Sequence, residues 1–490
     1  MTYLRRLSVL AIVLLSIQVV VHAQPQTLYH MRNVPQGIQM NPAFQPACNV
    51  FVGIPGANSI YVNGGNTAFS LSDALHYEPA IDSMVMAMHP RYGFKDQFYN
   101  VFKKGNYMQT EMKASILSFG FRINKDWYFT FENSVKTNFT FGYPKELMKF
   151  VLYGNAGTTD TEDSLVIPLK NFGIRLDAYH ETAFGLSREF SDELTIGARI
   201  KILNGIVNVN TKTNGASLTM GTDRWYYDKP VHVNVGGAIP NIFALDSAGM
   251  PSVDSNVSNN IMNYATVGSA FNNMGLALDL GVDYRPSDRL SLSASLVDFG
   301  FIHYGKKCGY NFQTAQDTSF QGVYVTPNLA SRVPAYGQAT LDTLATIFVS
   351  QFKQTGSQGA YNSYLTWKLY LGANYFIWPD RLSVGVLSRT QMYFKRIYEQ
   401  VTVSANFFPI KGFSTSLSYS VMNNNFSNIG LGMNFKAGPV NLYFVGDYMP
   451  LMYSAGYIPY KERMFNFQLG MNLLFGCGKK IKDRPMIDSY

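Results

Sequence analysis

The feature that most constrains the fold is a strict alternation of apolar and small or polar residues in the second half of the chain. From Phe465 to Phe475 the odd positions are Phe, Phe, Leu, Met, Leu and Phe, and Asn, Gln, Gly, Asn and Leu lie between them. The same alternation holds over 413–421 and 429–435. Successive side chains of a β-strand point to opposite faces. Each segment therefore predicts a strand with one apolar face and one small, polar face.

Short turns punctuate these strands. Their residues set turn dihedrals or hydrogen-bond to their own backbone, and they are Asn124-Lys125, Ser191-Asp192-Glu193, Pro286-Ser287-Asp288, Pro379-Asp380, Pro409-Ile410-Lys411 and Lys436-Ala437-Gly438. Longer polar connections lie at 143–170, 214–272, 304–362 and 450–463. Short turns that alternate with long loops are typical of outer-membrane barrels, with the turns in the periplasm and the loops outside the cell.

The turns also predict the number of strands. Six short turns define six hairpins, and an opening strand within 48–70 and a closing strand over 464–476 bring the count to about fourteen; twelve or sixteen also fit. The unbroken apolar phase over 172–186 predicts a strand longer than the nine to eleven residues that cross a bilayer, and hence an extracellular rim. The segments 71–104 and 144–153 do not alternate and predict short helices in loops, with Gly154 just past the second.

A soluble β-sandwich also has strands with one apolar face, so a barrel needs further arguments. Sandwich strands usually run five to six residues, and these are longer. Charged residues make up 15% of the chain, against about a quarter in ordinary soluble domains. Aromatic residues gather beside the turns, as at Trp127, Tyr375 and Trp378, which resembles the girdles at membrane interfaces. We therefore predict an all-β, transmembrane antiparallel barrel; a soluble secreted β-protein is the weaker alternative.

The first residues predict export. Arg5 and Arg6 precede an apolar run over 7–21 and the small-residue site Val21-His22-Ala23, which is the order of a cleaved signal peptide; an uncleaved anchor is the alternative. The predicted divisions are a signal peptide (1–23), a lead-in or plug (24–47), a barrel (48–476) and a polar periplasmic tail (477–490). The Gln-, Asn- and Pro-rich 24–46 segment fits either a mobile periplasmic lead-in or a plug in the lumen. The predicted location is the outer membrane of a Gram-negative cell.

Cysteines and net charge exclude several classes of site. Cys48, Cys308 and Cys477 are widely separated and form neither a zinc motif nor a disulfide framework, although one disulfide is compatible with the periplasm. The net charge is +8, but the basic residues are scattered and form no tract for nucleic acid. No common hydrolase, metalloprotease or phosphate-binding motif is present. We therefore expect no enzyme, cofactor, metal or nucleic-acid partner.

Charged residues of the polar phase are the candidate lumen residues, because Arg or Lys on the lipid face would cost about 2–4 kcal/mol at the bilayer midplane. They either pair to brace the interior or form a ring that selects solutes. They are Arg175, Asp177, Arg199, Lys201, Asp279, Asp283, Arg285 and Lys368.

Two stretches carry a family resemblance. Asn41-Pro42-Ala43-Phe44 resembles a signature near the N-terminus of Bacteroidota outer-membrane barrels. The second runs from Tyr179-His180-Glu181 through Gly185-Leu186-Ser187 to 194–205, with Gly154-Asn155-Ala156 upstream. Together they resemble an uncharacterised family of such barrels, similar to the long-chain fatty-acid transporter family and to some proteins linked to type IX secretion. The resemblance implies an outer-membrane barrel, with Asn41, Pro42 and Ala43 as a candidate plug motif, and no activity.

Barrel size and this resemblance favour a passive channel or transporter for small or hydrophobic solutes. Its expected partners are outer-membrane lipid, the barrel-assembly machinery during insertion and a small hydrophobic ligand. The alternative is a structural or secretion-associated scaffold whose loops bind proteins. The sequence indicates neither a substrate nor an oligomeric state.

Overall fold

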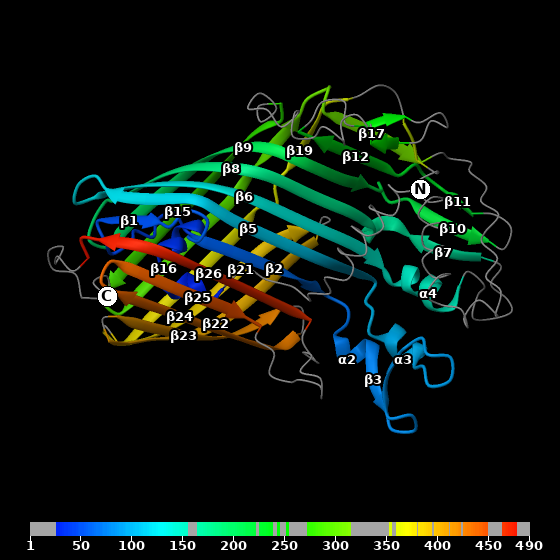
Figure 1. The fold of residues 1–490 in the computed structure, drawn as a ribbon, viewed down its shortest axis with the longest axis horizontal. Coiled ribbons are helices and arrows are strands. Elements are labelled where there is room, and N and C mark those ends of the chain that lie inside the picture. Colours follow the sequence, from blue (N-terminus) through cyan, green and yellow to red (C-terminus); the bar gives the residue numbers. More distant parts are fainter. Residues whose placement is uncertain are drawn as a thin grey trace.

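The computed structural model describes residues 26–154, 164–221, 225–238, 243–245, 251–253, 272–314, 352–354, 359–379, 381–393, 396–410, 412–422, 425–448 and 463–477. Antiparallel strands that follow one another in the chain close into one barrel of 14 strands (Figure 1), which confirms the predicted fold class. The predicted signal peptide (1–23) and residues 478–490 of the predicted tail lie outside the described residues.

The barrel begins with a split strand, β1 (Val50–Gly53) and β2 (Ser59–Asn66), which together form the first wall position. The strands that follow are β5 (Gly105–Arg122), β6 (Trp127–Pro144), β8 (Gly173–Glu189), β9 (Leu194–Lys212), β15 (Met274–Ser287), β16 (Leu290–Tyr304), β20 (Lys368–Trp378), β21 (Leu382–Tyr393), β22 (Arg396–Ile410), β23 (Phe413–Met422), β24 (Asn425–Ala437), β25 (Val440–Asp447) and β26 (Met464–Phe475). Closure comes from β26, which pairs with β1 through Val50↔Phe475 and with β2 through Ile60↔Leu469. A closed sheet leaves no unpaired edge in the wall.

The short connections lie at one end of the barrel, which we call the turn end; the opposite end is the loop end. All six predicted turns fall where consecutive strands meet at the turn end, although the strands β15, β22 and β24 extend into three of them. At the loop end two connections are also short, since only two residues separate β21 from β22 and β23 from β24. The pairing there continues to Tyr393↔Arg396 and Met422↔Asn425. Short turns and long loops therefore do not alternate around the whole barrel.

The long connections at the loop end contain small elements of their own. Between β2 and β5 lie α2 (Leu71–Ala74), the hairpin β3 (Leu75–Glu78) with β4 (Ser83–Met86), and α3 (Lys95–Asn100). Between β6 and β8 lie α4 (Lys145–Tyr153), β7 (Ser164–Pro168) and η3 (Leu169–Asn171), and α4 is capped at its C-terminus by Gly154, which has a φ of +82°. No helix among the described residues is long and apolar enough to cross a membrane.

Further strands extend the sheet beyond the barrel wall. β9 pairs with β15 up to Met274↔Asn204, and beyond that point it pairs with β12 (His232–Gly237). β17 (Gly309–Thr314) and β18 (Phe352–Gln354) continue this extension, and β19 (Tyr361–Tyr364) pairs with the end of β16. β10 (Ser217–Gly221) and β11 (Trp225–Tyr227) join β7 in a separate sheet, and β13 (Phe243–Leu245) pairs with β14 (Pro251–Val253). The extension forms a rim at the loop end (Figure 1).

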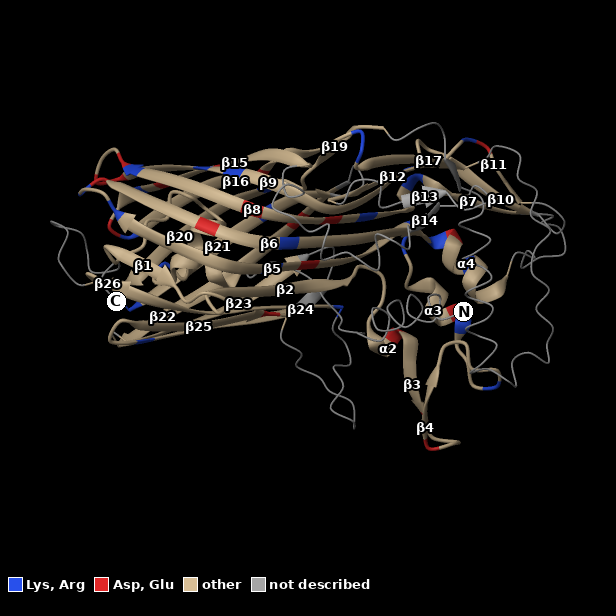
Figure 2. Cartoon of the chain, turned by 45° about the horizontal axis from the view of Figure 1, so that its top comes forward, with Lys and Arg blue, Asp and Glu red and all other residues tan. Residues whose placement is uncertain are grey.

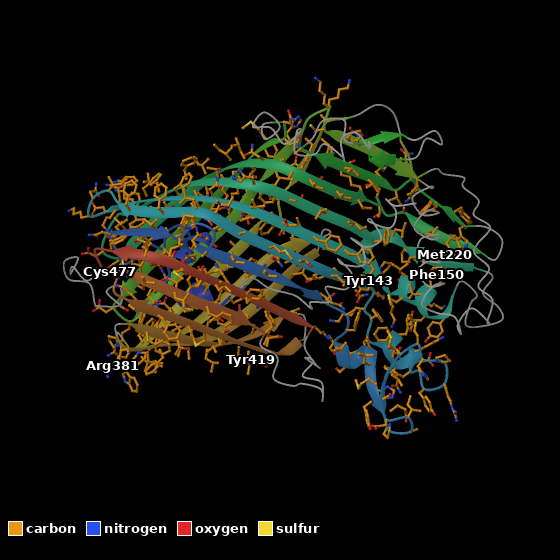
Figure 3. All side chains as sticks on the ribbon, in the orientation of Figure 1. Tyr143, Phe150, Met220, Arg381, Tyr419 and Cys477 are labelled. Atoms are coloured by element: carbon orange, nitrogen blue, oxygen red, sulfur yellow. A yellow bond between two sulfur atoms is a disulfide. The ribbon has the colours of Figure 1, made fainter. Side chains whose placement is uncertain are left out.

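The outer face of the barrel is apolar over a height that suits a bilayer. On β5 the exposed outward side chains include Met108, Met112, Ile116 and Phe121. From Met108 to Phe121 the strand covers about 43 Å at about 3.3 Å per residue, or about 33 Å of height at a tilt of about 40°. A hydrocarbon core is about 30 Å thick. Charged residues are sparse along the strands and frequent at the turn end (Figure 2). Figure 3 places Arg381 and Cys477 at the turn end and Tyr143, Phe150 and Met220 at the loop end.

Candidate functional site: the plugged lumen

Residues 26–47, which we call the plug segment, lie inside the barrel. The segment forms two short 3-10 helices, η1 (Thr27–His30) and η2 (Pro35–Gln39), the second starting at a proline. Its apolar side chains Leu28, Tyr29 and Phe44 are 1%, 0% and 6% exposed. Of the two arrangements that the sequence allows, a periplasmic lead-in or a plug, the structure places these residues in the lumen.

The amino end of the plug segment is held by Asp447 at the end of β25. The backbone N–H groups of Gln26 and Thr27 donate to the Asp447 carboxylate at 2.5 and 3.3 Å. The Thr27 hydroxyl contacts the same carboxylate and lies 2.6 Å from Ser418 Oγ on β23. A buried carboxylate with three such contacts is a strong anchor, since hydrogen bonds to a charged group are worth about 1.5–3 kcal/mol each.

The opposite wall holds the plug segment through Asp283 on β15. Arg32 donates from both terminal nitrogens to this carboxylate, at 3.0 and 3.2 Å, and its guanidinium carbon lies 3.5 Å from the centre of the Phe44 ring. Asp283 also accepts from Arg285 at 3.2 Å and from Ser291 at 3.0 Å. Asp283 and Arg285, both predicted lumen charges, therefore lie where the plug segment contacts the wall.

The Asn41-Pro42-Ala43 motif fits a notch made by two glycines. Gly197 on β9 and Gly281 on β15 are directly paired. A Cβ on Gly281 would lie 2.0 Å from Asn41 Oδ1, and one on Gly197 would lie 2.2 Å from the Pro42 carbonyl oxygen. In this notch Asn41 Nδ2 donates to the carbonyl oxygen of Val282 at 3.2 Å. The motif therefore needs a wall without side chains at this point.

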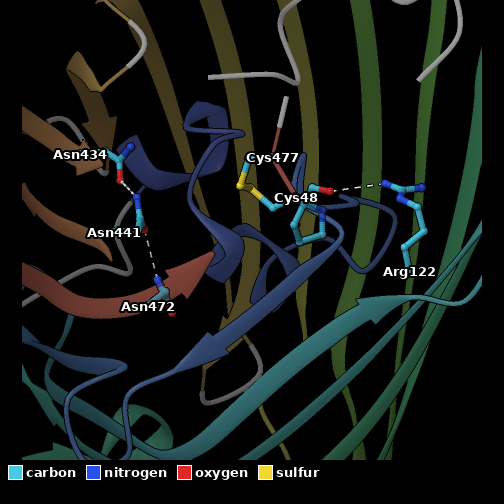
Figure 4. Close-up of a disulfide and its surroundings, with 7 residues drawn as sticks. Cys48, Arg122, Asn434, Asn441, Asn472 and Cys477 are labelled. Carbon is cyan, nitrogen blue, oxygen red and sulfur yellow. Dashed lines mark hydrogen bonds between the residues drawn. A yellow bond between two sulfur atoms is a disulfide. The ribbon is translucent and has the colours of Figure 1, made fainter. Parts of the chain in front are cut away.

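At the turn end, the base of the plug segment is tied down by a disulfide. Cys48 and Cys477 are bonded, which joins the chain two residues before β1 to the chain two residues after β26 (Figure 4). Beside it Arg122 donates to Gln45 Oε1 at 2.8 Å and to the Pro46 carbonyl oxygen at 3.4 Å. Cys308 is buried and is not disulfide-bonded.

A chain of side-chain amides lines the wall next to the plug segment. Gln36 donates to Asn472 at 2.7 Å. Asn472 donates to Asn441 at 3.3 Å, and Asn441 donates to Asn434 at 2.7 Å (Figure 4). Serines take the inward positions of β23, and Ser414, Ser416, Ser418 and Ser420 are all buried. The wall from β22 to β26 is thus dominated by uncharged amides and hydroxyls, because the small phase of the alternating segments faces the lumen.

An apolar cluster fills the space between the plug segment and the wall. The plug segment contributes Leu28, Tyr29, Met31, Val34, Met40 and Phe44, and the wall contributes Val297, Tyr370, Leu387, Tyr443 and Val445. Tyr29 stacks on Tyr370 with ring centres 5.8 Å apart. His30 is buried beside Gly385. Burial, with a smaller effect from Arg32, lowers the pKa of His30 to about 3, so the imidazole is neutral at physiological pH.

The other half of the wall carries a buried set of charges, which we call the ion-pair network. It spans β5, β6, β8, β9, β15, β16 and β20, and its members are Glu111, Lys113, Glu132, Lys136, Glu181, Arg199, Lys201, Asp279, Asp298 and Lys368. Consecutive pairs connect all ten residues, for example Arg199 to Glu132 at 2.7 Å and Lys201 to Asp279 at 2.7 Å. Arg199 also donates to the Ile38 carbonyl oxygen at 3.5 Å, which links the network to the plug segment.

Asp298 lies at the centre of this network. Its carboxylate is 2.6 Å from Lys201 Nζ, 3.1 Å from Lys136 Nζ and 3.8 Å from Lys368 Nζ. It has a φ of +59°, a left-handed conformation that Asp tolerates better than most residues. The register between β15 and β16 shifts at this point. The bulge turns Asp298 inward, although strict alternation from the inward Ser295 would point it to the lipid.

A family model matches most of the chain. Residues 42–447 match the family described as "Family of unknown function (DUF5723)". The chain belongs to this family. No curated protein matches the DUF5723 chain.

Several solved structures have a similar arrangement at low sequence identity to this chain. A Pseudomonas aeruginosa FadL homologue is 10% identical, with 89% of this chain and 91% of that chain covered and a TM-score of 0.39. The P. putida toluene transporter TodX is 9% identical, with 90% and 94% covered and a TM-score of 0.40. The CymD monoaromatic hydrocarbon channel is 8% identical, with 90% and 92% covered and a TM-score of 0.30. At these values the likeness carries no inference about function.

The eight predicted lumen charges of the DUF5723 barrel occupy three places. Arg199, Lys201, Asp279 and Lys368 belong to the ion-pair network. Asp283 and Arg285 lie at the plug segment. Arg175 and Asp177 pair with each other at 2.7 Å nearer the loop end, where Asp177 accepts from Asn208 at 2.7 Å and from Ser363 at 3.0 Å.

Other members of the site were not predicted from the sequence. Lys113, Glu132 and Lys136 could have been found by applying the same alternation to 105–122 and 127–144, where the polar phase carries these charges. Asp298 could not have been found in this way, because the bulge at this position interrupts the alternation of inward and outward side chains along β16. Among the described residues, no group of three or more His, Cys, Asp or Glu side chains is arranged to hold a metal ion.

Proposed function

We propose that this protein is a passive channel or transporter of the outer membrane for small or hydrophobic solutes, with the plug segment as its barrier. The observation that supports this most is the apolar patch on the inner wall. Barrel interiors are polar as a rule, yet Val297, Tyr370, Leu387, Tyr443 and Val445 face the lumen and are covered by the plug segment. If the plug segment moved away, a hydrophobic solute could bind to this patch. Its binding would gain about 25 cal/mol of free energy for each Å² of apolar surface buried.

The route of such a solute follows the wall from β22 to β26, which is rich in amides and hydroxyls. On the wall from β5 to β20 the charges of the ion-pair network are paired with one another at close distance. Amides and hydroxyls line the wall from β22 to β26, where the amino end of the plug segment sits. Movement of that end away from Asp447 would open this side first. The turn end then faces the periplasm and the loop end the outside, as in other barrels.

The test is to lock the amino end of the plug segment. Thr27 Oγ1 and Ser418 Oγ are 2.6 Å apart, so the double variant Thr27→Cys/Ser418→Cys is designed to form a disulfide between plug segment and wall. We expect the locked protein to lose permeation of arabinose and of the apolar dye N-phenyl-1-naphthylamine in proteoliposomes, and dithiothreitol to restore it. The single variants Thr27→Cys and Ser418→Cys, and the unchanged protein with dithiothreitol, control for the substitutions and for reduction of the native disulfide.

Two outcomes would count against the proposal. If the locked protein admits solutes as fast as the unchanged protein, the plug segment is not the barrier. If a variant that lacks residues 26–46 still folds and admits neither probe, the barrel is not a channel for them.

A second function is favoured by the number of anchors on the plug segment. Asp447, Asp283, the glycine notch and the disulfide hold it at four places, which suits a permanently closed scaffold whose loop-end elements bind proteins. Cross-linking in intact cells separates the two functions, because a scaffold should give one stoichiometric protein partner and remain impermeable in both assays.

A further inference from the structure

The segment between β2 and β5, comprising α2, β3, β4 and α3, forms a small lobe at the loop end, here the side lobe. Its interior is an aromatic cluster that also includes residues of the barrel strand β6 and of α4. Phe98 packs on Phe102 with ring centres 5.0 Å apart, and Phe102 lies 6.2 Å from Tyr143 of β6. Arg463, the residue before β26, pairs with Asp73 of α2 at 3.4 Å. These contacts give the side lobe a fixed orientation on the barrel.

The hairpin of the side lobe has two different faces. The register pairs His76 with Val85, and pairs Tyr77 with Met84. On the inner face Val85 is 2% exposed and the His76 ring lies 4.4 Å from the Phe94 ring. The outer face shows Tyr77, Met84 and Met86, which are 52%, 46% and 59% exposed, and Ile81 and Met88 next to it are 41% and 48% exposed. A contiguous apolar face of this kind is unusual on a water-facing surface and marks an interaction site.

The position of the hairpin identifies what covers this face. In both Figure 1 and Figure 2 the hairpin projects sideways past the barrel wall at the loop end. The side lobe joins β5 at Gly105, and the lipid-facing side chains of β5 begin at Met108, which is 44% exposed. The overhang therefore starts at the upper edge of the apolar band. When the barrel lies in a membrane, the headgroup surface of the bilayer surrounds it at the upper edge of its apolar band.

We propose that the outer face of the β3–β4 hairpin rests on the bilayer and inserts its methionines and Tyr77 between lipid headgroups. The side-chain chemistry suits this contact. Met and Ile gain from leaving water, and tyrosine rings prefer the headgroup level, where the hydroxyl stays hydrated or bonded. The Tyr77 hydroxyl donates to Asp82 at 2.5 Å. The inference depends on the barrel lying in a bilayer, and it does not depend on transport through the lumen.

The test compares two neighbouring positions on one strand. Met84→Cys and Ser83→Cys, each with Cys308→Ser, present a single thiol on opposite faces of β4 while the native disulfide stays intact. Each variant is labelled with an environment-sensitive nitrobenzoxadiazole dye and placed in nanodiscs of phosphatidylcholine and phosphatidylglycerol. We expect lipids spin-labelled near the headgroup to quench the dye at position 84 at least about twofold more than the dye at position 83. Iodide in solution should quench the dye at position 83 more than the dye at position 84.

Equal lipid quenching at both positions would overturn the proposal. So would a dye at position 84 that is shielded from lipid and from iodide alike, because that result indicates a protein partner on this face. Electrophoresis without boiling shows whether each variant is folded. If Met84→Cys does not fold, Met86→Cys on the same face takes its place, with the same expected order of quenching.

Discussion

At the scale of single residues, Gly197 and Gly281 determine how closely the plug segment approaches the barrel wall. Both lie on the lumen face of adjacent strands and are paired with each other. Their missing side chains allow Asn41 and Pro42 to contact the backbone of the wall. The Asn41-Pro42-Ala43 motif therefore has a physical role that its sequence alone does not reveal, because its partners lie more than 150 residues away in the chain.

Gly281→Ala tests this notch. The new Cβ would lie 2.0 Å from Asn41 Oδ1, so Asn41 must move and lose its bond to Val282, at a cost of about 1–3 kcal/mol. We expect the folded barrel to persist and trypsin to cleave after Arg32 faster than in the unchanged protein. Gly37→Ala is the control, since its Cβ would meet only the Phe44 ring, at 3.6 Å. Equal cleavage rates in both variants would show that the notch does not position the plug segment.

Asp298→Asn tests the ion-pair network. Asparagine keeps the shape of the side chain and tolerates the left-handed backbone, so the substitution removes the charge alone. Lys201 and Lys136 then lose a partner while they stay buried, and such losses cost about 3–5 kcal/mol. We expect the free energy of unfolding in urea to fall by about that amount. Asp288→Asn at the exposed turn end is the matched control, and a similar effect in both variants would contradict the central place of Asp298.

At the scale of elements, the strands were the most predictable part of the chain. Alternation over 413–421, 429–435 and 465–475 predicted β23, β24 and β26, because one face of a barrel strand meets lipid and the other meets a packed lumen. The β3–β4 hairpin was not predicted, since its strands have four residues each and short segments show no clear period. The position of the plug segment stayed open because its apolar residues have no regular spacing.

The disulfide is the element-scale feature with the largest expected effect on stability. It joins the base of the plug segment to the end of β26 across 429 residues, and disulfides typically contribute about 2–4 kcal/mol. The double variant Cys48→Ser/Cys477→Ser should therefore unfold at a lower urea concentration, with faster trypsin cleavage of the plug segment. Cys308→Ser is the control, because that residue has no disulfide to lose. If the urea concentration at the midpoint of unfolding did not change, the pairing of β1 with β26 would be enough to hold the base of the plug segment without the disulfide.

At the scale of the whole molecule, the inner wall has one side that carries the ion-pair network and another side on which Asp447 is the anchoring charge among amides and hydroxyls. The sequence predicted charges in the lumen, because charged residues on the lipid face are costly. It did not predict that most of them would collect on seven neighbouring strands, from β5 to β20, while buried amides and hydroxyls predominate on β22 to β26 beside Asp447. That division depends on which strands meet around the barrel and on the bulge at Asp298, neither of which a local pattern reports. The plug segment fits between the two sides.

The anchors of the plug segment have a consequence for the order in which the molecule is built. Gln26 bonds to Asp447 across 421 residues and Gln36 bonds to Asn472 across 436 residues. Gln26 and Gln36 can form these hydrogen bonds only after β25 and β26 have been added to the barrel. Contacts between residues so far apart in the sequence form slowly. A growing barrel must keep its interior accessible until β25 and β26 are in place. We therefore expect the plug segment to take its place late in biogenesis, after β25 and β26 have been added.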